Sequence, residues 1–227
     1  MDFAAYRALP ALNWSSLKHA RRSLLHFKFM EDQGDDDESK AMILGGAGHV
    51  SILEPDEFPL RYVVLPEPDK SLNRNTKEGK ARWAAWLETH PEDAGLDVDA
   101  YRMKVFREAN PGKTCLSEEE YRRCLGMRNS VRRHPIAQRL LEAGQAEQVI
   151  RWVDDRTKTP MKARIDWRRA AFVPVELKTA RSIDIHRFAG AAEGLGYFHQ
   201  VAMYRRGLAT LERCSRAAIA PHFVVVE

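Results

Sequence analysis

Two carboxylates and a lysine lie at a spacing that predicts one β-hairpin in the second half of the chain. Asp166 is followed ten residues later by Glu176 and Lys178, spaced as E-x-K. Apolar runs bounded by turn residues predict strands over 160–168 and 172–178. Alternate side chains of a strand share a face, so Glu176 and Lys178 point the same way. Asp166 on the neighbouring strand can then join Glu176.

This arrangement predicts a site for one divalent cation. Asp166 and Glu176 offer carboxylate oxygens, which Mg²⁺ and Mn²⁺ prefer as ligands. Lys178 beside them can hold or polarise an attacking water, and the three groups together supply the chemistry of metal-assisted phosphodiester hydrolysis. The same residue types also occur on solvated surface hairpins, so the flanking sequence decides between the two interpretations.

The flanking segments add an imidazole and a polar helix face. Three glycines precede His49 in a segment that is helical on balance over 39–53, although each Gly costs about 1 kcal/mol against Ala. Such glycines indicate close approach of another backbone or of DNA. Gln200 and Tyr204 share one face of a helix predicted over 197–211. Taken singly, His49 fits a hydrogen-bonded helix histidine, and Gln200 and Tyr204 fit a helix packed on a sheet.

Together the Gly-x-x-x-His segment, the D…E-x-K hairpin and the Gln-x-x-x-Tyr helix resemble the PD-(D/E)XK nuclease superfamily. Within it they resemble the exonuclease VIII-like family, which includes the RecE C-terminal nuclease domain. Ile165 stands where the superfamily name has Pro. The resemblance continues in order along nearly the whole chain, at 12–18, 52–58, 133–137 and 220–227.

The resemblance implies an α/β fold with a PD-(D/E)XK core, in which helices flank a small mixed central sheet and further helices precede it. It also implies that His49 and the backbone carbonyl of Leu177 join Asp166 and Glu176 around Mg²⁺ or Mn²⁺. Glu147, at the start of a strand predicted over 147–153, would support this metal site. Glu147 is also consistent with an ordinary surface carboxylate.

The implied activity is that of a metal-dependent exonuclease on double-stranded DNA ends. The family digests processively from 5′ to 3′, leaves 3′ overhangs for recombination with a single-strand annealing protein, and assembles as rings. Gln200 and Tyr204 would touch the DNA backbone or order Lys178. A PD-(D/E)XK endonuclease and a non-catalytic module that binds DNA ends remain alternatives. Because relatives often come from phages and prophages, we expect a cytoplasmic protein of bacterial or phage origin.

Positive charge supplies candidate DNA contacts. The formal net charge is +4, and Arg favours planar contacts with phosphates. Lys162 and Arg164 flank the acids of the hairpin, while Arg205 and Arg206 lie on the following helix. Arg164 can alternatively pair with Glu176, and a solvated helix face explains such arginines equally well.

Composition excludes several classes of protein. Three scattered cysteines without a C-x-x-C motif argue against structural zinc and are too few for a four-cysteine iron–sulfur cluster. Their odd number, without a signal peptide, suggests free thiols in a reducing cytosol. No apolar run reaches the roughly 18 residues that a membrane span needs.

The chain is expected to form a single nuclease domain over 1–227, with a helical part to about 145 and the catalytic sheet and helices from about 146. Its length also allows an added helical lobe. Because the chain ends inside a predicted strand, we expect it to be truncated at the C-terminus. The other expected elements are helices from Ser15 or Ser16 to about Met30, from Thr76, over 99–108, over 117–133 and from Pro135, an acidic loop over 31–38, and strands over 61–66 and 223–226.

Overall fold

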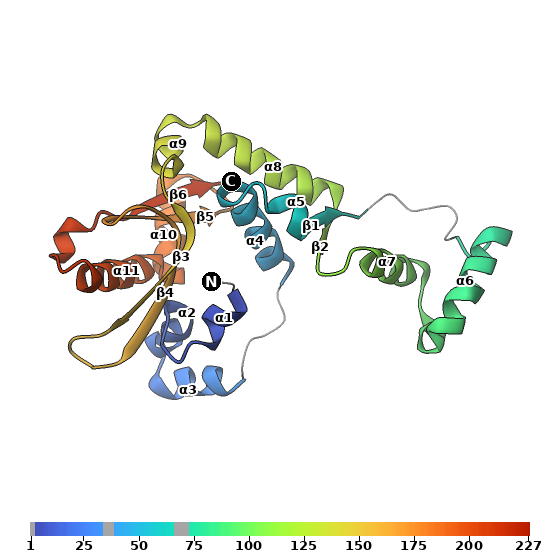
Figure 1. Cartoon of the computed structure of the whole chain (residues 1–227), viewed down its shortest axis with the longest axis horizontal. Coiled ribbons are helices and arrows are strands. Elements are labelled where there is room, and N and C mark those ends of the chain that lie inside the picture. The colour runs from blue at the N-terminus through green and yellow to red at the C-terminus, as the bar shows by residue number, and fades with distance from the viewer. Residues whose placement is uncertain (1–2, 34–38, 66–72) are drawn as a thin grey trace.

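The computed structural model describes residues 3–33, 39–65 and 73–227. The predicted α/β architecture is confirmed, because a small mixed sheet lies among flanking helices (Figure 1). Most of the expected acidic loop, residues 34–38, lies outside the described residues. Among the residues described, every helix is too short or too polar to cross a membrane.

Four strands form the central sheet in the order β3-β4-β5-β6. Their bounds are β3 (Gln145–Val153), β4 (Pro160–Ala170), β5 (Val173–Thr179) and β6 (His222–Val226). β3, β4 and β5 are antiparallel neighbours, and β6 joins β5 in parallel. The expected hairpin is therefore β4–β5, and the sheet is mixed as predicted.

One face of the sheet is covered by α4 (Lys40–Leu53) and α8 (Glu118–Arg133). Leu177 of β5 is fully buried against them. A Cβ on Gly48 would lie 2.9 Å from Met127 Cε and 3.2 Å from Thr179 Cγ2. The close approach expected for the glycines of this helix is real at Gly48, but the neighbours are side chains of α8 and β5.

α10 (Ile185–Leu195) and α11 (Tyr197–Leu211) lie on the other side of the sheet. Leu208 of α11 packs in a cluster with Ile165 of β4, and both side chains are fully buried. Gly196 joins the two helices with φ 76, a left-handed conformation that favours Gly.

The N-terminal region contains several short helices, so the prediction of one helix from Ser15 or Ser16 to Met30 is wrong. Asn13 caps the helix that begins at Trp14 by accepting the Ser16 N–H at 2.9 Å, and Ser23 accepts the His26 N–H at 3.0 Å. These side chains offer the backbone alternatives to a continuous helix. The short helices are α1 (Phe3–Ala8), α2 (Trp14–Leu17), η1 (Lys18–Arg21) and α3 (Leu24–Gln33).

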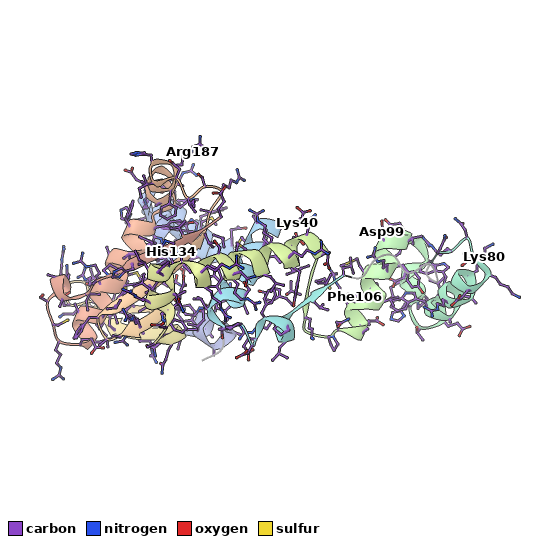
Figure 2. The ribbon with its side chains drawn as sticks, turned by 90° about the horizontal axis from the view of Figure 1, so that it is seen from above. Lys40, Lys80, Asp99, Phe106, His134 and Arg187 are labelled. Atoms are coloured by element: carbon purple, nitrogen blue, oxygen red, sulfur yellow. The ribbon has the colours of Figure 1, made fainter. Side chains whose placement is uncertain are left out.

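A helical arm projects from the body of the molecule (Figure 1). It lies between β1 (Tyr62–Val64) and β2 (Thr114–Leu116), which pair in parallel at its base. In Figure 2, Lys80, Asp99 and Phe106 lie on the arm, far from Arg187 on α10. Its helices are α6 (Lys77–Thr89), η3 (Pro91–Gly95) and α7 (Val98–Ala109), and the remaining helices of the body are α5 (Phe58–Arg61), α9 (Pro135–Leu141) and η4 (Arg216–Ala218).

The arm has an aromatic core of its own. Trp83 and Trp86 meet the ring of Tyr101 edge-on, with centroid separations of 4.7 and 5.4 Å. Asp93, which is 3% exposed, accepts the indole N–H of Trp86 and pairs with Lys104. This packing explains how two tryptophans of α6 are stabilised away from the main sheet.

Candidate metal centre and active site

Asp166 lies where β4 and β5 diverge. The paired register of the two strands runs from Ala170–Val173 to Trp167–Val175. Beside its last pair, the Asp166 carboxylate accepts the backbone N–H of Leu177 at 2.8 Å. A side-chain hydrogen bond thus replaces a backbone hydrogen bond between the two strands. This bond fixes the Asp166 carboxylate at the opening between β4 and β5. Burial raises the pKa of Asp166 despite the opposing Lys178 charge.

Glu147 of β3 lies directly across from Asp166 of β4. Ala146 pairs with Trp167 and Gln148 pairs with Ile165, so Glu147 and Asp166 lie opposite each other at the one unpaired position between them. The φ of Glu147 is 53, in the left-handed region that costs a non-Gly residue roughly 1–2 kcal/mol. Strained backbone conformations of this kind often occur at functional sites. Here the strained residue carries a carboxylate.

His49, Glu147 and Asp166 form a group that fits one metal ion, with ligand atoms that all lie within 4.8 Å of one another. His49 Nδ1 is 3.8 Å from Asp166 Oδ2. Burial, reinforced by the charge of Lys178, lowers the pKa of His49 to about 4, so its imidazole is neutral at pH 7. Burial also raises the pKa of Glu147 to about 7. A cation would favour the ionised carboxylates and would use the lone pair of the imidazole.

Glu176 and Lys178 lie beside this group and face each other. Lys178 Nζ is 2.6 Å from Glu176 Oε1. Glu176 Oε2 is buried and has no hydrogen-bond partner among the described residues. An orphaned buried carboxylate oxygen is costly, so it fits a position that a cation would satisfy. Glu176 thus reaches the site from the side of Lys178, while Glu147 takes the more central place expected for Glu176.

Lys178 is suited to orient a reactant rather than to remove its proton. Burial opposes its charge, but Glu176 and Asp166 outweigh that effect and raise the pKa of Lys178. Its ammonium therefore stays protonated at neutral pH. The backbone of Leu177, whose carbonyl was expected among the ligands, hydrogen-bonds to His49. It therefore lies at the edge of the same group.

Gln200 and Tyr204 support β4 from behind the site. Gln200 Nε2 donates to Tyr204 Oη at 2.9 Å, and the Tyr204 hydroxyl donates to the carbonyl of Arg164 at 3.0 Å. Tyr204 is buried, and burial raises its pKa well above the ordinary value. The pair was expected to touch DNA or to order Lys178, which stays a prediction; its hydrogen bonds hold the strand that carries Asp166.

Arg164 pairs with Glu147 rather than with Glu176. Its Nε lies 2.7 Å from Glu147 Oε2, and its guanidinium lies over the ring of Phe3 at 4.3 Å. A positive charge at this position would meet a phosphate next to the metal group. Arg164 therefore remains a candidate DNA contact.

Lys162 is not available to DNA in this structure, which corrects its assignment as a candidate contact. It is 5% exposed, and its ammonium donates to the carbonyls of Tyr6, Arg7 and Leu9 at 3.0, 2.9 and 2.9 Å. The N-terminal segment also pairs with β4 through Leu12. Lys162 thus anchors the first residues of the chain to the catalytic hairpin.

Arg205 and Arg206 are engaged within the protein. Arg205 donates from Nε and Nη2 to the carbonyl of Arg216 at 3.2 and 2.9 Å. Arg206 forms ion pairs with Asp154 and Asp155 at the β3–β4 turn. Their proposed DNA contacts would compete with these interactions.

Tyr197 is a residue of the site that sequence reasoning missed. Its ring centroid lies 4.5 Å from Lys178 Nζ. The only sequence signal was an aromatic residue three positions before Gln200, at the start of the polar helix. An aromatic at such a position is common in packed helices, so the contact becomes visible only in three dimensions.

Comparison with known proteins agrees with this geometry. A family model described as a PDDEXK-like domain of unknown function (DUF3799) matches residues 14–227. A search of curated proteins finds no match. The matched range includes His49, Glu147 and Asp166, whereas the segment that Lys162 anchors lies before it.

Proposed function

This chain belongs to the family of PDDEXK-like domains, and on that premise we propose that it is a divalent-metal-dependent nuclease that digests DNA from its ends. The observation that carries the proposal is the group of His49, Glu147 and Asp166, with ligand atoms within 4.8 Å of one another. Glu176 and Lys178 beside it complete the residue types of the superfamily. The family description supports a nuclease, and the resemblance to exonuclease VIII-like enzymes supports action at DNA ends.

Each side chain has a role that follows from its environment. His49, Glu147, Asp166 and Glu176 would hold Mg²⁺ or Mn²⁺, with the Leu177 carbonyl at the edge of the site. The bound ion would polarise the scissile phosphate and stabilise developing charge. The Lys178 ammonium orients the attacking water and adds positive charge, since its raised pKa keeps it protonated.

The finer proposal is an exodeoxyribonuclease that resects double-stranded DNA from 5′ to 3′. The 3′ overhangs would serve recombination with a single-strand annealing protein, and a homo-oligomeric ring would keep the enzyme on its substrate. These features rest on the resemblance to the exonuclease VIII-like family. Duplexes labelled at the 5′ or the 3′ end test the polarity, and light scattering over a wide concentration range tests the assembly.

The decisive experiment compares linear and covalently closed forms of one plasmid, each with Mg²⁺, Mn²⁺ or EDTA. We expect metal-dependent loss of the linear form alone. Cleavage of the closed circle would instead make the protein an endonuclease. Survival of both forms with Mn²⁺ would leave a module that binds DNA without cutting it.

Variants of the site assign the activity to these residues. We expect Lys178→Ala and Glu176→Ala to abolish digestion while DNA binding survives, because the cation site and the oriented ammonium serve the reaction. Glu88→Ala changes an exposed carboxylate on the arm and should digest like the wild type. Digestion by either site variant at the wild-type rate would overturn the assignment.

A further inference from the structure

The ammonium of Lys178 has an aromatic neighbour in addition to its carboxylate partner. Lys178 Nζ lies 4.5 Å from the ring centroid of Tyr197, within the range of a cation–π interaction. The Lys178 side chain is 14% exposed, so water screens this contact only weakly. The ring therefore constrains the direction in which the ammonium points.

The Tyr197 ring is held in place by elements on several sides. Phe188 of α10 lies 6.4 Å from it, and Phe188 also meets Phe223 of β6 at 6.1 Å. Gly196 precedes the ring with φ 76, and a Cβ there would lie 2.5 Å from Trp14 Cζ2. The turn that places Tyr197 at the start of α11 is consequently tightly defined.

The contacts of Lys178 with Glu176 and with Tyr197 respond differently to a bound cation. Glu176 Oε1 is 2.6 Å from the ammonium, but the second oxygen of the same carboxylate is buried without a hydrogen-bond partner among the described residues and is free to bind a cation. When Glu176 takes part in binding a cation, its negative charge is shared between the cation and Lys178. The Tyr197 ring binds no metal, so its hold on the ammonium is independent of that competition.

We propose that Tyr197 is a positioning residue, which keeps the Lys178 ammonium aimed at the reaction centre when Glu176 engages the cation. This inference rests on the proposed nuclease function and deepens it. Tyr197 would orient Lys178, while Gln200 and Tyr204 support the strand that carries Asp166. This role of Tyr197 also explains why an ammonium would keep one direction in a site where its carboxylate partner is shared.

Three variants test the proposal by steady-state digestion of linear DNA. Tyr197→Leu removes the aromatic face, and Tyr197→Phe keeps it. Phe198→Leu is the matched control, since it changes the adjacent aromatic, which is 49% exposed and packs on Phe223. We expect kcat of Tyr197→Leu to fall about tenfold with KM nearly unchanged, as the loss of one cation–π contact predicts. Tyr197→Phe and Phe198→Leu should stay within about threefold of the wild type.

A spectroscopic readout tests the contact without relying on activity. In protein with ¹³C-labelled lysine, the ε-methylene resonance of Lys178, assigned by its loss in Lys178→Arg, should be shifted upfield by the Tyr197 ring current. The shift should persist in Tyr197→Phe and disappear in Tyr197→Leu. An ordinary Lys178 resonance in the wild-type protein overturns the proposal even if a variant fails to fold.

The outcomes separate this inference from the function on which it rests. If Lys178→Ala abolishes digestion but Tyr197→Leu digests like the wild type, the positioning role is wrong and the nuclease assignment stands. A Tyr197→Phe variant as impaired as Tyr197→Leu also overturns the positioning role, because the aromatic face would then not be what matters. If Lys178→Ala digests normally, the assigned nuclease site itself is wrong.

Discussion

Glu147 should destabilise the metal-free protein at neutral pH, so replacing it by its neutral isostere Gln should stabilise that form. The Glu147 side chain is 20% exposed, and burial raises its pKa from 4.5 to about 7. The folded state therefore binds a proton more tightly than the unfolded state between these pH values. Stability contributed by the protonated carboxyl is complete below pH 4.5 and is lost as the pH rises through about 7.

The magnitude follows from the same shift. One pKa unit corresponds to about 1.4 kcal/mol, so a rise from 4.5 to about 7 amounts to about 3 kcal/mol at pH 8. His49 acts in the opposite direction, because its lowered pKa of about 4 removes stability as the pH falls below 6.5. Both proteins contain His49, so the difference between wild type and Glu147→Gln isolates the contribution of Glu147.

Urea unfolding in EDTA measures this difference. We expect Glu147→Gln to be more stable than the wild type by up to about 3 kcal/mol at pH 8, and nearly equal to it at pH 4.5. Mn²⁺ at 100 times its Kd for the wild type should remove most of this difference, because it stabilises the wild-type folded state by about 2.7 kcal/mol and the variant lacks one charged ligand. A Glu147→Gln protein that is less stable in EDTA at pH 8, or that gains as much from Mn²⁺, would refute the reasoning.

Two further substitutions test the way the site is supported. Lys162→Met should lower the free energy of unfolding by about 3 kcal/mol, because buried carbonyls lose their donor. The same variant should keep the wild-type DNA affinity at fixed salt. Stability equal to that of the wild type, or a reduced salt dependence of DNA binding, would contradict the role of Lys162 as an anchor. Gly196→Ala should lower the melting temperature, since a left-handed residue costs Ala roughly 1–2 kcal/mol and its Cβ would meet Trp14. Gly194→Ala, where a Cβ meets nothing within 4 Å, is the matched control and should melt no lower than the wild type.

The hairpin and its acids could be predicted from the sequence because they depend on local patterns. Apolar runs around a turn predicted that Asp166, Glu176 and Lys178 lie on adjacent strands. The alternation of side chains predicted that Glu176 and Lys178 share one face. The start of α6 at Thr76 and the capping box at Ser117 could also be predicted from the sequence, because helix caps are short-range hydrogen bonds. These parts of the fold are confirmed.

The missed features depend on backbone conformation or on contacts between distant segments. Glu147 could be named as a candidate, but its backbone has a positive φ opposite Asp166, which no local residue pattern predicted. Lys162 was expected to face DNA. Its actual partner could not be predicted, because the contact with Tyr6 joins residues more than 150 positions apart. Tyr197 meets Lys178 only because the turn at Gly196 aims the start of α11 at β5.

The most direct test of the metal centre is a titration of Mn²⁺ followed by the electron paramagnetic resonance signal of the free ion. We expect the wild-type protein to bind Mn²⁺ and Asp166→Asn to lose most of this binding, because Asp166 supplies a charged ligand to the group that it forms with His49 and Glu147. Asp155→Asn, which changes an exposed carboxylate at the β3–β4 turn, should bind Mn²⁺ like the wild type. Equal Mn²⁺ binding by Asp166→Asn and the wild type would contradict the proposed metal centre.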